Sequence, residues 1–240
     1  MSNLLIDSIA SEPLLSLPFN VVNSLGALEV DNLHVLSGTC TGLPKALHGL
    51  LLASDLQGTI EDLLLGEALA KELETHLGDS SKNYGVILCG DLHAYSHKRG
   101  GSGDVRGVWN AFAKRFKWVV GVAGNHDVFG PGWSLKHLEI FKQQNGINLL
   151  DGDDNTVILD NLRFSGLSGV IGNPRKPFRR TREDYLEAVR KLDSQQPDLL
   201  ILHEGPGLGS QNETEFPGDE ELLENITSPL VCCGHKHWNN

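Results

Sequence analysis

Apolar runs alternate with amphipathic segments along the chain from residue 49 onward. The first three apolar runs cover 49–54, 84–89 and 118–123, and their length and β-branched content are typical of buried strands. Between them, residues 59–77 and 105–116 space their apolar side chains three or four positions apart, as amphipathic helices do. A third helix is expected to begin at Ser134. This β-α-β-α-β-α order predicts a right-handed α/β architecture, with the loops that carry function at the carboxyl ends of the strands.

Strand-like and helix-like segments continue to alternate up to the end of the chain. The later elements are a hairpin over 156–166 that turns at Asp160-Asn161, a helix that begins near Thr181, a strand over 198–202, a short acidic helix around 220–225 and a last strand over 230–233. The first 48 residues do not show this alternation of strands and helices. Residues 28–38 contain the same Asp-Asn-Leu sequence as the later hairpin, so we interpret them as an additional hairpin.

No low-complexity linker interrupts the sequence. We therefore expect an N-terminal extension over residues 1–48, packed on a single domain over residues 49–240. At 240 residues with 40% hydrophobic content, the chain is long enough to bury a full core.

Charge and cysteine content narrow the function classes. The formal net charge of −11 disfavours general nucleic-acid binding. The four cysteines form no Cys-x-x-Cys pattern and three lie in apolar runs, which indicates free thiols in a reducing compartment. The sequence shows no signal peptide and no apolar stretch that could span a bilayer, so we expect a cytoplasmic protein without membrane contact. The oligomeric state stays open.

Metal-binding side chains follow the predicted strands. Gly124-Asn125-His126-Asp127 comes after the third run, and Gly234-His235-Lys236-His237 comes after the last. The other strand ends carry Asp55 and Gln57, Asp91, and His203. Carboxylate, amide and imidazole ligands suit Mn²⁺, Fe or Zn²⁺, and a carboxylate can bridge two such ions.

The order Asp-x-His, Gly-Asp, Gly-Asn-His-Asp/Glu, His, Gly-His-x-His is that of the calcineurin-like metallophosphoesterases, which this chain resembles over about residues 50–238. The resemblance implies a four-layer α/β/β/α sandwich of two mixed sheets flanked by helices, here with the extra N-terminal hairpin. It also implies two divalent ions, with Mn²⁺ preferred over Fe, Zn²⁺ or Ni²⁺. The implied reaction is hydrolysis of a small phosphomonoester or phosphodiester by in-line attack of a metal-bound hydroxide.

The resemblance assigns a role to each matching residue. Asp55 and His237 would hold the first metal, Asp91 would bridge, and Asn125, His203 and His235 would hold the second. His126 would protonate the leaving oxygen as general acid, and Asp127 would hold His126 in orientation.

The first motif departs from the family pattern, because Gln57 stands where the family has histidine. His93 lies two residues beyond Asp91 and is expected to replace the missing imidazole in part or to contact substrate. An alternative alignment takes Asp91-Leu92-His93 as the first motif and Gly103-Asp104 as the second. We disfavour it, because the polar residues 98–102 cannot form the buried strand that should precede Asp104.

The C-terminal end also departs from the family pattern, since the family normally continues past Gly-His-x-His with further strands. Two explanations stay open: the sequence is shortened, or the N-terminal hairpin supplies the missing sheet edge.

Two further features bear on function. The dense basic run over residues 175–182 is either a solvated surface or a clamp in which Arg179 and Arg180 hold the substrate phosphate. Arg99, in the glycine-rich loop 98–103, is a further candidate substrate contact. The competing function class is a non-catalytic interaction scaffold with a weakened metal site, which Gln57 would fit. Retention of His126 favours the enzyme.

Overall fold

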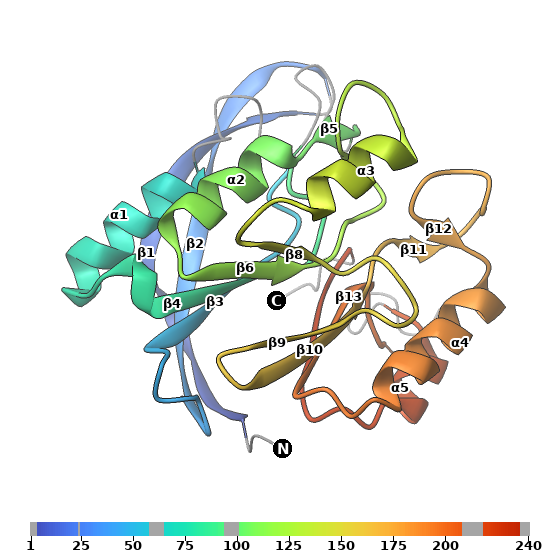
Figure 1. The fold of residues 1–240 in the computed structure, drawn as a ribbon. Helices are drawn as coiled ribbons and strands as arrows, with labels where there is room; N and C mark the ends of the chain where they lie inside the picture. Colours follow the sequence, from blue (N-terminus) through green and yellow to red (C-terminus); the bar gives the residue numbers. More distant parts are fainter. Residues whose placement is uncertain (1–3, 24, 58–64, 94–100, 208–217, 236–240) are drawn as a thin grey trace.

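The computed structural model describes residues 4–23, 25–57, 65–93, 101–207 and 218–235. Two four-stranded sheets pack face to face, and helices cover the outer face of each (Figure 1). This is the four-layer sandwich that the resemblance implied. Among the described residues, no helix is long and apolar enough to cross a membrane.

The first sheet has the strand order β3-β4-β6-β8, and every described pair in it is parallel. Its strands are β3 (Gly49–Ala53), β4 (Tyr84–Leu88), β6 (Trp118–Gly121) and β8 (Ile147–Leu149). The 3-10 turn η2 (Ser81–Asn83) precedes β4. The helices that follow these strands are α1 (Leu65–Leu77), α2 (Arg106–Arg115) and α3 (Leu135–Lys142).

The second sheet has the order β14-β13-β10-β9 and is mixed, because β9 runs antiparallel to β10. Its strands are β9 (Thr156–Leu159), β10 (Leu162–Leu167), β13 (Leu199–Glu204) and β14 (Val231–Gly234). The helices α4 (Arg182–Asp193) and α5 (Glu220–Asn225) lie beside it in Figure 1. Two short parallel pairs, β5 (Gly103–Asp104) with β7 (Asp127–Val128) and β11 (Val170–Ile171) with β12 (Arg179–Arg180), connect loops at the strand ends. The prediction of two mixed sheets therefore holds for this sheet, whereas the described strands of the first sheet are all parallel.

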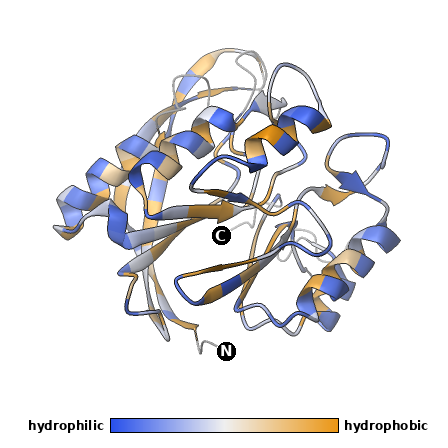
Figure 2. Cartoon of the chain, viewed as in Figure 1, coloured by the Kyte–Doolittle hydropathy of each residue, from blue (hydrophilic) through white to orange (hydrophobic). Residues whose placement is uncertain are grey.

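Alternation along β4 explains why its sequence is apolar without interruption. Val86 and Leu88 join the core beneath α1 and α2, whereas Ile87 and Cys89 join the core between the two sheets. A strand buried on both faces must carry apolar side chains at successive positions. Figure 2 shows the apolar colour on the strands and mixed colour on the helices that face solvent.

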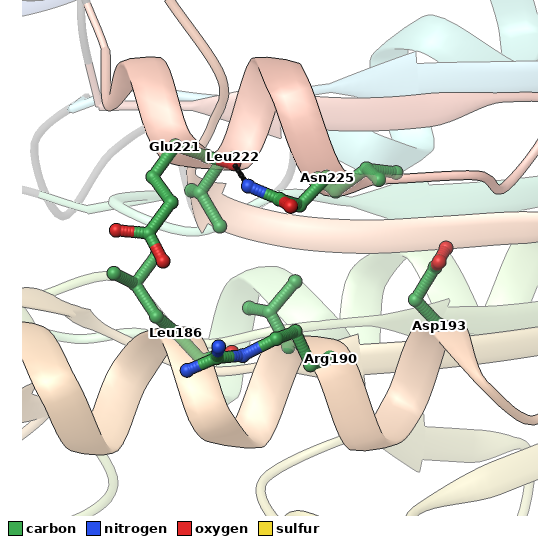
Figure 3. A pocket seen from close by; sticks show the side chains of 8 residues that line it. Leu186, Arg190, Asp193, Glu221, Leu222 and Asn225 are labelled. Carbon is green, nitrogen blue, oxygen red and sulfur yellow. Dashed lines mark hydrogen bonds between the residues drawn. The ribbon is translucent and has the colours of Figure 1, made fainter.

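Helix α4 packs on the outer face of the second sheet, where Tyr185 and Val189 lie against Leu200 and Leu202. Its start follows the prediction, since Thr181 accepts a hydrogen bond from the Asp184 N–H. A small groove between α4 and α5 is lined by side chains from both helices (Figure 3). Asp193 at its edge is bonded to Thr227 and Ser228, which indicates a structural role.

The N-terminal hairpin differs from the prediction in its turn. The strands β1 (Leu5–Val22) and β2 (Leu28–Thr41) pair in antiparallel fashion, and the described residues between them are 23 and 25–27. The side chain of Asn23 accepts hydrogen bonds from the N–H groups of Leu25 and Ala27, and Gly26 has a φ of +79°, so this segment meets the needs of a tight turn. The predicted turn at residues 31–32 is wrong, because those residues lie inside β2 opposite β1.

The Asp-Asn-Leu sequence therefore adopts two different conformations in this chain. Asp160 and Asn161 do form the two-residue turn between β9 and β10, with φ of +48° and +68°. In β2, pairing with β1 determines the backbone conformation instead. Leu33 and Val35 of β2 pack against the core beneath α1.

Candidate metal centre

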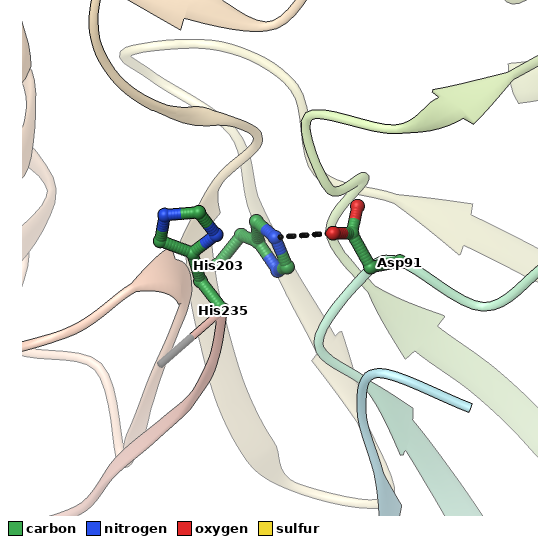
Figure 4. A group of neighbouring side chains, drawn as sticks. All are labelled: Asp91, His203 and His235. Carbon is green, nitrogen blue, oxygen red and sulfur yellow. Dashed lines mark ion pairs between the residues drawn. The ribbon is translucent and has the colours of Figure 1, made fainter. Parts of the chain in front are cut away.

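Three side chains from both sheets converge at the carboxyl ends of the strands. Asp91 follows β4, His203 lies in β13, and His235 follows β14; their ligand atoms all lie within 4.8 Å of one another (Figure 4). The Asp91 Oδ2 and His203 Nε2 atoms are 3.4 Å apart, and the two imidazole centroids are 5.1 Å apart. Asp91 and His203 are buried, with 2% and 0% exposure. The resemblance placed these three residues in one centre, and the structure brings them together.

His203 is oriented by a backbone carbonyl. Its Nδ1 lies 2.6 Å from the carbonyl oxygen of Cys89, which fits donation from Nδ1 and leaves Nε2 facing Asp91. Nε2 is buried and, apart from the ion pair with Asp91, has no hydrogen-bond partner among the described residues. Burial alone would lower the pKa of His203, but the neighbouring Asp91 carboxylate raises it above its usual value. The raised pKa favours a protonated imidazole beside Asp91, and a cation bound at Nε2 would displace that proton.

Asn125 presents a buried acceptor. Its side chain is buried, and Oδ1 has no hydrogen-bond partner among the residues that the structure describes. A buried acceptor without a donor costs about 1–3 kcal/mol. A divalent cation would offset that cost at Asn125. The observed residues therefore fit the metal that the resemblance implied.

Asp91 has the surroundings expected of a bridging carboxylate. Oδ1 accepts a hydrogen bond of 2.9 Å from the backbone N–H of His126, and Oδ2 faces His203. Burial raises the pKa of Asp91, but His203 and the His126 N–H outweigh it, so the pKa is lowered overall. The carboxylate is thus kept in its charged, metal-binding form.

Asp55 and Gln57 approach the same edge of the sheet. Asp55 Oδ2 accepts hydrogen bonds from the His235 N–H at 2.9 Å and from the Ser54 hydroxyl at 2.5 Å. The Gln57 N–H donates to the Asp91 carbonyl at 3.2 Å. The loop after β3 is thereby tied to two of the three converging residues, although Asp55 itself is not part of the three-residue cluster found among the described residues.

Backbone strain concentrates at these positions. Asp55, Gln57, Asp91 and His235 all have φ between +42° and +69°. Residues other than glycine avoid this left-handed region, and such strain clusters at ligand sites. The resemblance had assigned all four to the metal centre.

Glycines precede the ligands because no side chain would fit there. A Cβ on Gly124 would lie 2.0 Å from the Asp91 Oδ1, and one on Gly234 would lie 2.4 Å from the Asp55 Oδ2. The glycines of the Gly-Asn-His-Asp and Gly-His motifs are therefore required by close packing between neighbouring loops.

Asp127 does not bond to His126 in the way that the resemblance implied. Its Oδ2 accepts from the N–H groups of Gly124 (2.7 Å) and Asp91 (3.1 Å), and its Oδ1 accepts from that of Leu92 (3.1 Å). Burial and the Asp91 charge raise the pKa of Asp127. Asp127 thus joins the loops after β4 and β6.

The remaining predicted site residues lie around this centre or outside the described residues. His126 is half-buried, and its carbonyl accepts from the N–H of Gly103. His93 is buried beside Gly103, whose added Cβ would meet the His93 Cδ2 at 2.8 Å, but His93 is not in the cluster formed by the described ligands. His237 and Arg99 lie outside the described residues, so their roles stay predictions.

The two arginines of the basic run form β12. Arg180 Nη1 pairs with Asp153 Oδ1 at 2.9 Å, and Arg179 Nη1 donates to the Pro177 carbonyl at 3.4 Å. Neither has a recorded contact with the three-residue cluster among the described parts of the chain. The clamp stays a prediction.

Two supporting groups of the site were not expected from the sequence. The Cys89 carbonyl orients His203, and the Ser54 hydroxyl bonds to Asp55. A backbone carbonyl leaves no signal in a sequence, and a single serine before Asp55 is too common to attract notice. All four cysteines are free thiols, as expected.

The two-sheet sandwich gathers carboxylate, amide and imidazole donors at the strand ends, which suits a bound divalent metal. A family model for the calcineurin-like phosphoesterases matches residues 49–239, and the chain belongs to this family. A comparison with curated proteins found no match.

Proposed function

We propose that this chain hydrolyses a small phosphomonoester or phosphodiester with two divalent metal ions, Mn²⁺ being the preferred metal. The observations that carry the proposal are the cluster of Asp91, His203 and His235 and the buried Oδ1 of Asn125, which has no hydrogen-bond partner among the described residues. Mixed oxygen and nitrogen donors suit Mn²⁺ among the divalent ions.

Metals bound here would neutralise phosphoryl oxygens and lower the pKa of water at the site. Asp91 would lie between the two ions, and Asn125, His203 and His235 would hold one of them. Asp55, with Gln57 and His237, would hold the other. The short bond from Nδ1 of His203 to the Cys89 carbonyl orients the ring so that Nε2 faces Asp91 and the proposed metal.

His126 supplies the proton for the leaving oxygen. Its backbone N–H is fixed by Asp91, and its carbonyl by Gly103, so the residue is held beside the centre from two sides. A positioned general acid contributes typically 10²–10⁴-fold to the rate.

The test is Mn²⁺-dependent hydrolysis of p-nitrophenyl phosphate and bis(p-nitrophenyl) phosphate. We expect turnover that EDTA abolishes, and a loss of about 10²-fold or more in His126→Ala with metal content retained. His76→Ala, which changes an exposed histidine of α1, is the matched control and should keep full activity.

The second candidate function is an interaction scaffold, and Gln57 in place of the family's histidine is the observation that favours it. Binding of metal without hydrolysis of either ester, or equal rates in the wild type and His126→Ala, would favour the scaffold over the enzyme.

A further inference from the structure

The N-terminal hairpin exposes an unusual amount of apolar surface. Of the fourteen large apolar residues that are exposed in the described part of the chain, seven lie between residues 5 and 36. They are Leu5, Ile6, Ile9, Leu25, Leu28, Val30 and Leu36, with exposures of 50–91%. Contiguous exposed apolar patches on soluble proteins mark interaction sites more often than chance.

These side chains gather on one face of the hairpin. Successive residues of a strand point to opposite faces, and residues paired across two strands share a face. Leu33 and Val35 pack on the domain, so Leu28, Val30 and Leu36 lie on the opposite face. Ile9 pairs with Gly38 and Ile6 with Cys40, two positions of the same parity as Leu36. Five of the seven residues therefore form a single outward face.

The outward row of β2 carries no charge, although the chain as a whole has a formal charge of −11. Its members are Leu28, Val30, Asn32, His34, Leu36, Gly38 and Cys40, whereas Glu29 and Asp31 fall on the inward row. His34 is bonded across the hairpin to Ser16 at 2.8 Å. In a two-fold dimer each surface meets its own copy, so a row with carboxylates would repel itself. An uncharged row in an acidic chain suits a second copy.

The area fits a weak dimer. Full burial of a Leu, Ile or Val side chain removes roughly 60–120 Å² of apolar surface, as its transfer free energy implies. Because the five residues are 50–67% exposed, they supply roughly 180–350 Å², below the roughly 800 Å² per partner of a stable interface. We therefore expect a dimer that dissociates on dilution.

We propose that the outward face of the hairpin, formed by Ile6, Ile9, Leu28, Val30 and Leu36, packs against the same face of a second copy of this chain. The two hairpins stack face to face, about 10 Å apart, around a two-fold axis. The inward faces stay on their own domains, so each metal centre is complete within one chain. The proposal does not depend on the proposed hydrolysis.

The test is the molar mass of the full chain in solution, measured by light scattering from roughly 1 to 100 μM. We expect twice the 26.1 kDa of one chain, with a shift towards 26.1 kDa on dilution. The double variant Val30→Lys, Leu36→Lys should have the single-chain mass at every concentration. Ile158→Lys is the matched control, because Ile158 of β9 is 60% exposed outside the hairpin, and it should keep the doubled mass.

A milder variant tests whether misfolding, and not loss of the interface, causes a single-chain mass. Val30→Thr keeps the shape and the β-branch, so it should fold as the wild type does, by circular dichroism, and weaken the dimer at least tenfold in dissociation constant. A wild-type protein that stays at 26.1 kDa over the whole range would overturn the proposal, as would a double variant that keeps the doubled mass.

Discussion

The carboxylate of Asp91 and the imidazole of His203 come from different sheets, yet their nearest atoms lie 3.4 Å apart with both side chains buried. Two sheets packed face to face place the ends of β4 and β13 side by side, which neither sheet could do alone. Burial of a carboxylate and an imidazole is costly unless they pair with each other or hold a cation, and this pair is placed to do either.

Gly124→Ala should weaken metal binding. The new Cβ would lie 2.0 Å from Asp91 Oδ1, so Asp91 must move away from His203. We expect the dissociation constant for Mn²⁺ to rise by about 10–100-fold, the usual effect of disturbing a ligand's support. Isothermal titration with Mn²⁺ measures it. In Gly152→Ala the nearest atom is 3.4 Å away, and this control should bind Mn²⁺ normally.

Asp127→Asn should destabilise the fold. The change turns one acceptor into a donor that faces backbone N–H groups of Gly124, Asp91 or Leu92. A buried mismatch of this kind costs about 1–3 kcal/mol, equivalent to a Tm lower by roughly 2–10 °C. Thermal unfolding with and without metal checks this. An unchanged Tm would contradict the role of Asp127 in joining the two loops; Glu187→Gln, on the exposed face of α4, is the control.

Asp151 should make stability depend on pH. Burial raises its pKa to about 6, and Lys142 and Arg180 offset only part of that effect. The folded chain therefore holds a proton more tightly than the unfolded chain, and stability falls as the pH rises from about 4 to about 6.

Asp151→Asn removes this loss. We expect it to raise the free energy of unfolding on the order of 1–2 kcal/mol at pH 7.5, allowing for partial exposure, and to have little effect near pH 4. Urea denaturation at both pH values measures the difference. A gain of equal size at both would mean that titration of Asp151 is not the cause.

Gln57→His tests the departure from the family's first motif. If glutamine weakens this site, the substituted imidazole should lower the Mn²⁺ concentration that gives half-maximal turnover by at least about tenfold. His93→Ala tests the alternative. Should it leave metal content and turnover unchanged, His93 does not replace the missing imidazole.

Periodicity and turn chemistry predicted most of the elements because each is a local property. The helix after Thr181 and the turn at Asp160-Asn161 follow from neighbouring residues alone. The turn expected at residues 31–32 failed because a distant strand, β1, pairs with this segment. Pairing with a distant strand cannot be inferred from the neighbouring residues in the sequence.

In the candidate site, too, some features could be predicted from the sequence and others could not. The motif order brought Asp91, His203 and His235 into one prediction, because strand ends in this architecture meet at one edge. The role of Asp127 was misjudged, since a motif names a carboxylate but does not say which donors surround it. Its partners are backbone amides on two loops.

The most direct test of the central claim is the metal content of the purified chain after loading with Mn²⁺ and desalting, measured by mass spectrometry of the elements. The account predicts two ions per chain in the wild type and a loss of at least one in His203→Ala, in a variant that remains folded by circular dichroism. A wild-type chain that retains no Mn²⁺, or a His203→Ala variant that retains both ions, would contradict it.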